Sequence, residues 1–206
     1  MTNTINGARR TGRVTSASLV ALALTLALAA GLAGPTAWAA AEPGALPSDA
    51  EGFAFLAGHW RVQHRKLKDP LSGTEEWNEF DGSATFMSLV DGVVSVEELR
   101  DAQGKPFGGA MRTFDRERRV WSDSWVGVRD GVLQPGVIGR FNGPVGTFTT
   151  PDTYKDLVIL ARGVWRRLSP DEVTWEQFFS RDDGQSWQLT WHMRFVRTGG
   201  PSAGSK

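Results

Sequence analysis

The chain has 206 residues, its 23 lysines and arginines balance 23 aspartates and glutamates, and it contains no cysteine. The lack of cysteine excludes disulfides, thiol catalysis, zinc–thiolate sites and a lipid-modified cysteine anchor. With a balanced charge and no basic run, a nucleic-acid partner is not expected.

The N-terminal segment has the layout of a secretory signal peptide. Three arginines within the first 13 residues precede an uncharged apolar run, 19–34, and then the small-residue site Ala37-Trp38-Ala39. Charged, apolar and cleavage regions in this order are typical of export signals. We therefore predict a signal peptide over 1–39, an exported protein (periplasmic or extracellular), and no membrane association after cleavage. The pair Arg9-Arg10 leaves both the general and the twin-arginine export routes open.

The rest of the chain is long enough for one domain. Removal of the signal segment leaves 20 basic and 23 acidic side chains in about 165 residues, sufficient for a hydrophobic core. Residues 40–50, rich in alanine, proline and glycine, predict a flexible leader, and 198–206 predict a disordered tail. The folded domain is expected over 51–197.

This domain reads as short strands separated by turn residues. After a short turn at 51–58, strands are predicted at 59–68, 75–88, 92–101, 107–115, 119–127, 136–141, 145–150, 156–168, 172–181 and 186–197, with 151–155 as a surface loop. Asp-Gly and Asn-Gly pairs at several breaks supply the positive φ of tight hairpins. Ten short strands without intervening helices predict an all-β fold, a single up-and-down antiparallel barrel of about ten strands.

Two local motifs support a barrel of this kind. The triplet Gly58-His59-Trp60 resembles the Gly-x-Trp signature of lipocalins, which implies that Trp60 closes one barrel end. An arginine of the last strand, Arg194 or Arg197, would then stack on its ring, a contact worth about 1 kcal/mol. Residues 180–187 fit the Asp-box pattern Ser-x-Asp-x-Gly-x-Ser-Trp. One copy in so short a chain predicts a structural hairpin rather than a glycosidase site.

Over the whole domain, the sequence is similar to a bacterial family of exported lipocalin-like proteins of unknown function. The matching stretches are 55–60, 76–80, 111–115 with Trp121, 175–180 continuing into the Asp-box, and 191–193. The resemblance implies a calycin-type barrel. It supplies no activity and no catalytic residues.

Charged residues inside strands are the first candidates for a site. Arg112 alternates with Ala110 and Phe114 on one strand face, and Arg162 also shares its face with apolar residues. Such neighbours predict inward-facing arginines, which need an acidic partner or an anionic ligand. Glu176 shares its face with a phenylalanine and is the candidate partner.

Aromatic residues are the second candidates. Of eight tryptophans after the signal segment, we expect most to fill the core. Trp125 and Trp175 are expected to line a cavity because polar residues, Asp123 and Gln177, share their strand faces. His64 lies on the apolar face of the first strand and is expected to point inward.

These residues predict a non-enzymatic binder of a small, mostly apolar molecule with a polar or anionic group. Arg112, Arg162 and Glu176 would hold that group, and tryptophans would hold the body. Two alternatives stay open. One is an enzyme of isomerase, cyclase or decarboxylase type with Glu176 or His64 as its titrating group. The other is a structural or interaction barrel without a ligand.

No metal and no cofactor are expected. The three histidines lack the spacing of ligand pairs. The pair His192-Met193 resembles a fragment of nitrobindin-like barrels, which bind haem through a histidine, but the fuller N-terminal pattern of that family is missing from this sequence.

Overall fold

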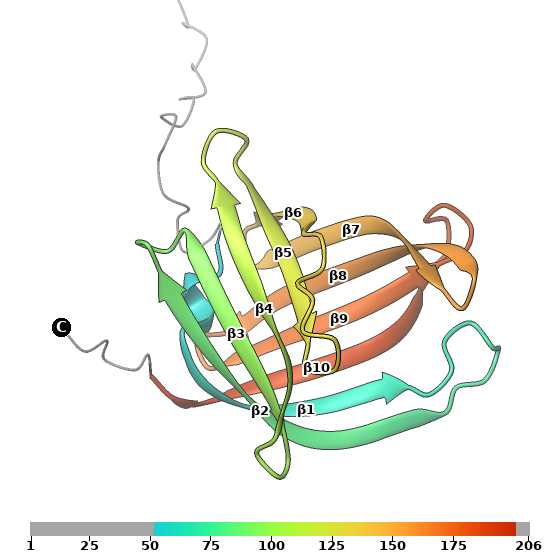
Figure 1. Ribbon diagram of the computed structural model, residues 1–206, viewed down its shortest axis with the longest axis horizontal. Helices are drawn as coiled ribbons and strands as arrows, with labels where there is room; N and C mark the ends of the chain where they lie inside the picture. Colours follow the sequence, from blue (N-terminus) through green and yellow to red (C-terminus); the bar gives the residue numbers. More distant parts are fainter. Residues whose placement is uncertain (1–51, 201–206) are drawn as a thin grey trace, which may run out of the picture. The chain divides into compact units, whose positions relative to one another are not determined.

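The structure, a computed structural model, describes residues 52–200, so the predicted signal peptide and leader lie outside the described residues. It contains a short 3₁₀-helix, η1 (Ala54–Leu56), and ten strands (Figure 1). The strands are β1 (Gly58–Leu67), β2 (Trp77–Leu89), β3 (Val94–Asp101), β4 (Pro106–Asp115), β5 (Val120–Gly127), β6 (Val137–Asn142), β7 (Val145–Tyr154), β8 (Leu157–Ser169), β9 (Glu172–Ser180) and β10 (Gln188–Gly199). Within 52–200, no helix has the length and apolar character needed to cross a membrane.

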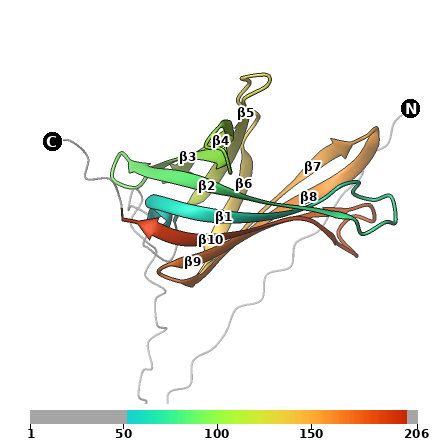
Figure 2. The same ribbon diagram turned by 90° about the horizontal axis from the view of Figure 1, so that it is seen from below.

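The ten strands form one closed antiparallel barrel. Each strand pairs with its neighbours in the chain, and β1 also pairs with β10, from His59↔Gly199 to Lys66↔Trp191. Figure 2 shows β2, β1 and β10 lying side by side at this closure. The predicted all-β, up-and-down barrel is therefore confirmed.

Alternation along the strands places the core inside the barrel. In β1, Trp60, Val62 and His64 are buried, while the residues between them are exposed. A period of two is the signature of a strand with one buried face. The inward orientation predicted for His64 is confirmed.

One end of the barrel is closed by aromatic side chains under η1. Phe53 contacts the rings of Trp121 and Trp165 at centroid distances of 5.0 and 5.8 Å. The Trp60 Nε1 donates to the Leu56 carbonyl oxygen at 2.7 Å. The guanidinium of Arg197 lies 4.1 Å from the centre of the Trp60 ring. Of the two arginines predicted to stack on this ring, Arg197 is therefore the one that does so.

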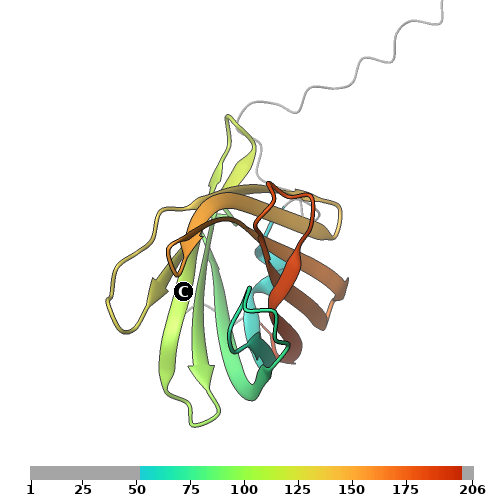
Figure 3. The same ribbon diagram turned by 90° about the vertical axis from the view of Figure 1, so that its right-hand side faces the viewer.

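Arg197 also ties the closed end together through its hydrogen bonds. Its guanidinium donates to the carbonyl oxygens of Phe55, Ala57 and Pro170 at 2.7 to 3.1 Å. One side chain therefore connects the segment around η1, the β8–β9 turn and the last strand. The opposite end carries the β1–β2, β7–β8 and β9–β10 connections, which face the viewer in Figure 3.

Two strands extend further than the sequence predicted. β7 continues through Pro151 to Tyr154, where a loop was expected, and the turn follows at Lys155 and Asp156, both with positive φ. Pro151 is tolerated because β7 pairs there with β8 alone among the described strands. β10 includes Gly199, which pairs with His59, so two residues assigned to the disordered tail belong to the barrel.

The Asp-box forms the hairpin between β9 and β10, as predicted. Asp182 accepts hydrogen bonds from the backbone and hydroxyl of Ser186 and from the hydroxyl of Ser180. These bonds lower the pKa of Asp182 to about 2. Gly184 adopts φ of 86°, and Trp187 donates to its carbonyl oxygen. All these contacts lie within the turn, which supports its structural role.

Candidate functional site

A cavity of about 240 Å³ lies inside the barrel, next to the aromatic closed end. Its lining residues are Lys66, Glu97, Leu99, Ala110, Arg112, Asp123, Trp125, Trp165, Trp175, Gln177, Trp191 and Met193. They come from seven strands, β1, β3, β4, β5, β8, β9 and β10. Four tryptophans therefore surround a set of charged groups in the centre of the barrel.

An ionic cluster forms one wall of the cavity. Arg112 is 2% exposed, and its Nη2 donates to a carboxylate oxygen of Glu97, which is 5% exposed. The Arg112 Nε lies 3.1 Å from an oxygen of Asp123. The guanidinium also lies 4.8 Å from the Phe53 ring and 4.9 Å from the Trp165 ring. Arg112 thus separates the aromatic closed end from the cavity.

The pKa directions in this cluster follow from burial and mutual attraction. Burial raises the pKa of Glu97, and the charge of Arg112 partly opposes that shift. Burial disfavours the charged form of Arg112, but Asp123 and Glu97 outweigh it and raise the Arg112 pKa. Lys66, whose Nζ lies 4.0 Å from the centre of the Trp191 ring, has its pKa lowered by burial. Arg112 therefore pairs with both carboxyl groups, whereas Lys66 contacts an indole ring.

Several polar atoms of the lining residues have no hydrogen-bond partner within residues 52–200. They are Nη1 of Arg112, Oε1 of Glu97, and the indole Nε1 atoms of Trp165 and Trp191. Burying such groups without a partner costs about 1–3 kcal/mol each. Three donor atoms and one carboxyl oxygen of the cavity-lining residues are thus buried and unpaired within 52–200.

Three of the six predicted site residues line this cavity, and Arg162, Glu176 and His64 do not. Arg112, Trp125 and Trp175 line it. The inward orientation predicted for Arg162 is wrong, because its guanidinium stacks 3.6 Å above Trp187 of the β9–β10 hairpin on the outer surface. Its side chain borders a smaller pocket in the barrel wall.

Glu176 does not partner the buried arginine either. Its Oε2 lies 3.1 Å from the Nε of Arg166, whose side chain is 44% exposed. Its chain neighbours Trp175 and Gln177 point to the cavity, so Glu176 projects from the opposite face of β9. The partners of Arg112 are instead Glu97 and Asp123.

His64 lies inside the barrel beside the cavity. Its ring stacks on Phe80 at 4.4 Å, and Trp191 lies 5.9 Å away. Neither ring nitrogen finds a partner in the described part of the chain. Burial, with help from Lys66, lowers the pKa of His64 to about 4. His64 is therefore uncharged at neutral pH and packs as an aromatic ring.

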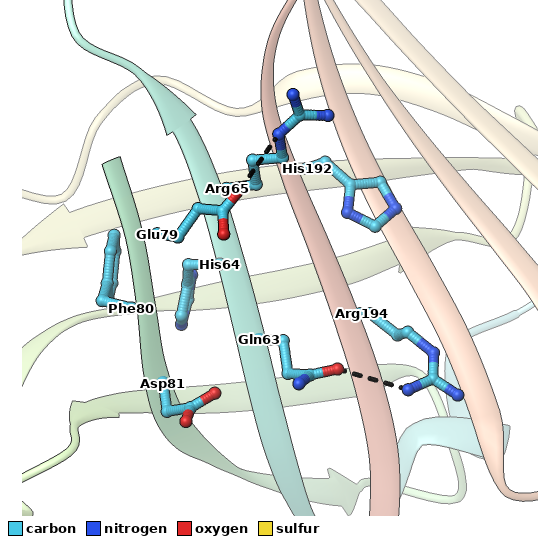
Figure 4. Close-up of a pocket in the computed structure, with 8 residues that line it drawn as sticks. All are labelled: Gln63, His64, Arg65, Glu79, Phe80, Asp81, His192 and Arg194. Atoms are coloured by element: carbon cyan, nitrogen blue, oxygen red, sulfur yellow. Dashed lines mark hydrogen bonds and ion pairs between the residues drawn. The ribbon is translucent and has the colours of Figure 1, made fainter. Parts of the chain in front are cut away.

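A second pocket lies at β10, β1 and β2, and it is lined by polar residues of these strands together with His64 and Phe80 (Figure 4). Arg65 lies 3.4 Å from Glu79, and Arg194 pairs with Glu172 at 2.7 Å and donates to Gln63 at 3.2 Å. His192 lies here, on the face of β10 opposite the cavity residue Trp191. A haem ligated by His192 would thus lie outside the barrel.

Two cavity-lining residues, Glu97 and Lys66, were not predicted as site residues from the sequence. Asp123 and Gln177 were considered there only because they share strand faces with Trp125 and Trp175. Glu97 alternates with Ser95 and Leu99, both buried, whereas Val94 and Val96 are more exposed. An apolar pattern would place the valines inward, so the sequence carries no local signal for Glu97. Within 52–200, no cluster of three or more histidine, aspartate and glutamate side chains is arranged to hold a metal ion.

Comparisons with known proteins add little to this geometry. No family model and no curated protein matches the sequence. A solved structure, the crystal structure of Rv2717c from M. tuberculosis, is similar over 70% of this chain and 94% of its own length, with 15% identity and a TM-score of 0.45. The class of protein is thus set by its own geometry, a closed ten-stranded up-and-down antiparallel β-barrel with an internal cavity lined by polar and aromatic residues.

Removing Arg112 should damage the fold far more than neutralising Glu97. Arg112→Leu leaves the buried Glu97 and the partly buried Asp123 without their cation, so the free energy of unfolding should fall by about 3–5 kcal/mol. Glu97→Gln keeps the shape and leaves Asp123 to pair with Arg112, so its loss should be much smaller. Urea unfolding at pH 7 measures both. Arg166→Leu on the outer surface is the control, and equal losses in all three variants would contradict the assignment.

His64 should make stability depend on pH below neutrality. The unfolded chain binds a proton on His64 near pH 6.5, whereas the folded protein does so near pH 4. The depressed folded pKa means that stability present above pH 6.5 is lost as pH falls toward 4, by up to about 3 kcal/mol. His64→Leu should remove this loss in pH-dependent urea unfolding. The control His192→Gln should retain it, and a His64→Leu profile identical to wild type would refute the assignment.

Proposed function

We propose that this protein is an exported binding protein whose barrel holds one small, flat, mostly apolar molecule of no net charge. The observation that carries the proposal is the set of buried, unpartnered polar atoms in an aromatic-lined cavity. A cavity with apolar walls and a few convergent polar groups is the usual form of a small-molecule site. A filled structural barrel would have no use for these groups.

The size of the cavity limits the ligand. Its volume of about 240 Å³ lies below the ~300–1,000 Å³ that is common for ligand pockets. The walls favour flat rings, because Trp175 and Trp191 meet at 89° with their centroids 5.5 Å apart and form a corner. A ring in that corner would stack on one indole and contact the edge of the other.

The charges favour a polar ligand over an anionic one. The lining carries two acidic groups, Glu97 and Asp123, against two basic ones, Arg112 and Lys66, and an anion at the guanidinium would meet both carboxyl groups. The free donors on Arg112, Trp165 and Trp191 suit a carbonyl or another uncharged acceptor. Of the polar and anionic groups expected from the sequence, the uncharged polar group is the one the cavity supports.

An enzyme on the same barrel is the second candidate, with Glu97 in place of the residues first considered. Glu97 lines the cavity and burial raises its pKa, which are the properties of a general acid. Glu176 pairs with Arg166 outside the cavity. Chemical conversion of a co-purified molecule by wild-type protein, lost in Glu97→Gln, would favour an enzyme. Unchanged recovery of that molecule favours a binder.

A matched pair of fluorescent probes tests the proposed site. N-phenyl-1-naphthylamine is uncharged, and 8-anilino-1-naphthalenesulfonate has the same rings with a sulfonate. The uncharged probe should bind with a Kd at least about tenfold lower. Trp175→Leu should weaken its binding by a similar factor, whereas Trp187→Leu, on the outer surface, should not. Fluorescence titration measures both, and tighter binding of the sulfonate, or no binding of either probe, would contradict the proposal.

A further inference from the structure

The paired stretches in the barrel wall are shortest where β6 joins β5 and β7. β5 pairs with β6 from Trp121↔Gly139 to Asp123↔Val137, and β6 pairs with β7 from Gly139↔Phe148 to Asn142↔Val145. Beyond these positions, toward the open end, the described strands β5 and β7 share no ladder, and the bridge Val126↔Leu133 is isolated. A seam therefore runs between the ends of β5 and β7.

A pocket of about 140 Å³ lies in this seam. Asp123 and Val137 line one side of it, and Phe148, Thr150 and Asp152 of β7 line the other. Asp123, Trp175 and Gln177 line both this pocket and the central cavity. The same three side chains thus form the boundary between the central cavity and the seam.

Apolar side chains cover one side of the open end of the barrel. Leu71 of the β1–β2 connection and Tyr154 pack against Ile159, Ala161 and Phe179. A ligand that entered along the axis on the side of β7, β8 and β9 would have to displace this cluster.

Polar contacts hold this cover in place. The Lys155 Nζ lies 2.7 Å from Oδ1 of Asp69, and the Tyr154 hydroxyl donates to the same oxygen at 3.4 Å. The Leu71 backbone N–H donates to the Gln188 side chain at 2.8 Å. The β1–β2 connection is thereby fastened to both the β7–β8 and the β9–β10 hairpins, which restricts entry along this side of the axis.

We infer that the ligand enters through the seam between β5 and β7 and is elongated, with its polar group at Arg112 and Glu97 and its tail in the seam pocket. The inference rests on the proposed function and adds a route and a shape to it. Gly163 is the residue that keeps the passage open. A Cβ at this position would lie 3.2 Å from the Nε1 of Trp175, so a larger side chain would narrow the junction.

The absence of cysteine makes the route directly testable in the full protein. Thr150→Cys places a thiol in the seam, and Thr147→Cys places one on the exposed outer face of the same strand. Coupling a polyethylene-glycol maleimide at 150 should slow the association of N-phenyl-1-naphthylamine, followed by stopped-flow fluorescence, by about tenfold or more. The same modification at 147 should leave the rate unchanged.

Asp69→Ala, which releases the axial cover, separates the two routes. Entry through the seam predicts an unchanged association rate in this variant. Faster association in Asp69→Ala, with no effect of the modification at 150, would establish the axial route and overturn the inference while leaving the binding site intact. If unmodified protein does not bind the probe at all, the proposed function fails and the inference fails with it.

Discussion

The structure depends on one buried charge, the guanidinium of Arg112. A charge in a barrel core is tolerated when opposite charges and hydrogen bonds surround it, and here β3 and β5, the two neighbours of β4, each supply a carboxyl group. The rings of Phe53 and Trp165 contact the guanidinium from the closed end. Arg112 therefore fixes where the apolar core stops and the polar cavity begins. A second arginine, Arg197, stacks on the ring of Trp60 and covers it at the outside of the closed end.

This arrangement explains why a cavity persists in a barrel so rich in large rings. The ionic cluster leaves an Nη1 donor of Arg112 and a Glu97 oxygen without hydrogen-bond partners in the described part of the chain, and the indole N–H groups of Trp165 and Trp191 are also unpaired there. Apolar side chains cannot fill the cavity without leaving these groups unsatisfied. The polar cluster and the tryptophan corner are thus two parts of one cavity lining.

The architecture could be predicted from the sequence because strand alternation and Asp-Gly turns are local signals. The orientation of Arg112 was predictable for the same reason, since Ala110 and Phe114 mark its face. The stretch 157–164 is apolar on both strand faces, so the sequence does not determine whether the face that carries Arg162 points into the barrel. A register slip of one residue would exchange the inner and outer faces. The pairing of Arg112 with Glu97 and Asp123 depends on the register between β3, β4 and β5, which no local pattern encodes.

The central claim is that the cavity holds one small uncharged molecule, and native mass spectrometry of the protein purified from its own host tests it most directly. We expect one discrete excess mass per chain, which disappears on unfolding and is lost from Trp175→Leu but retained by Trp187→Leu. A folded protein that carries no excess mass in any preparation, or an excess mass equally present in both variants, would contradict it.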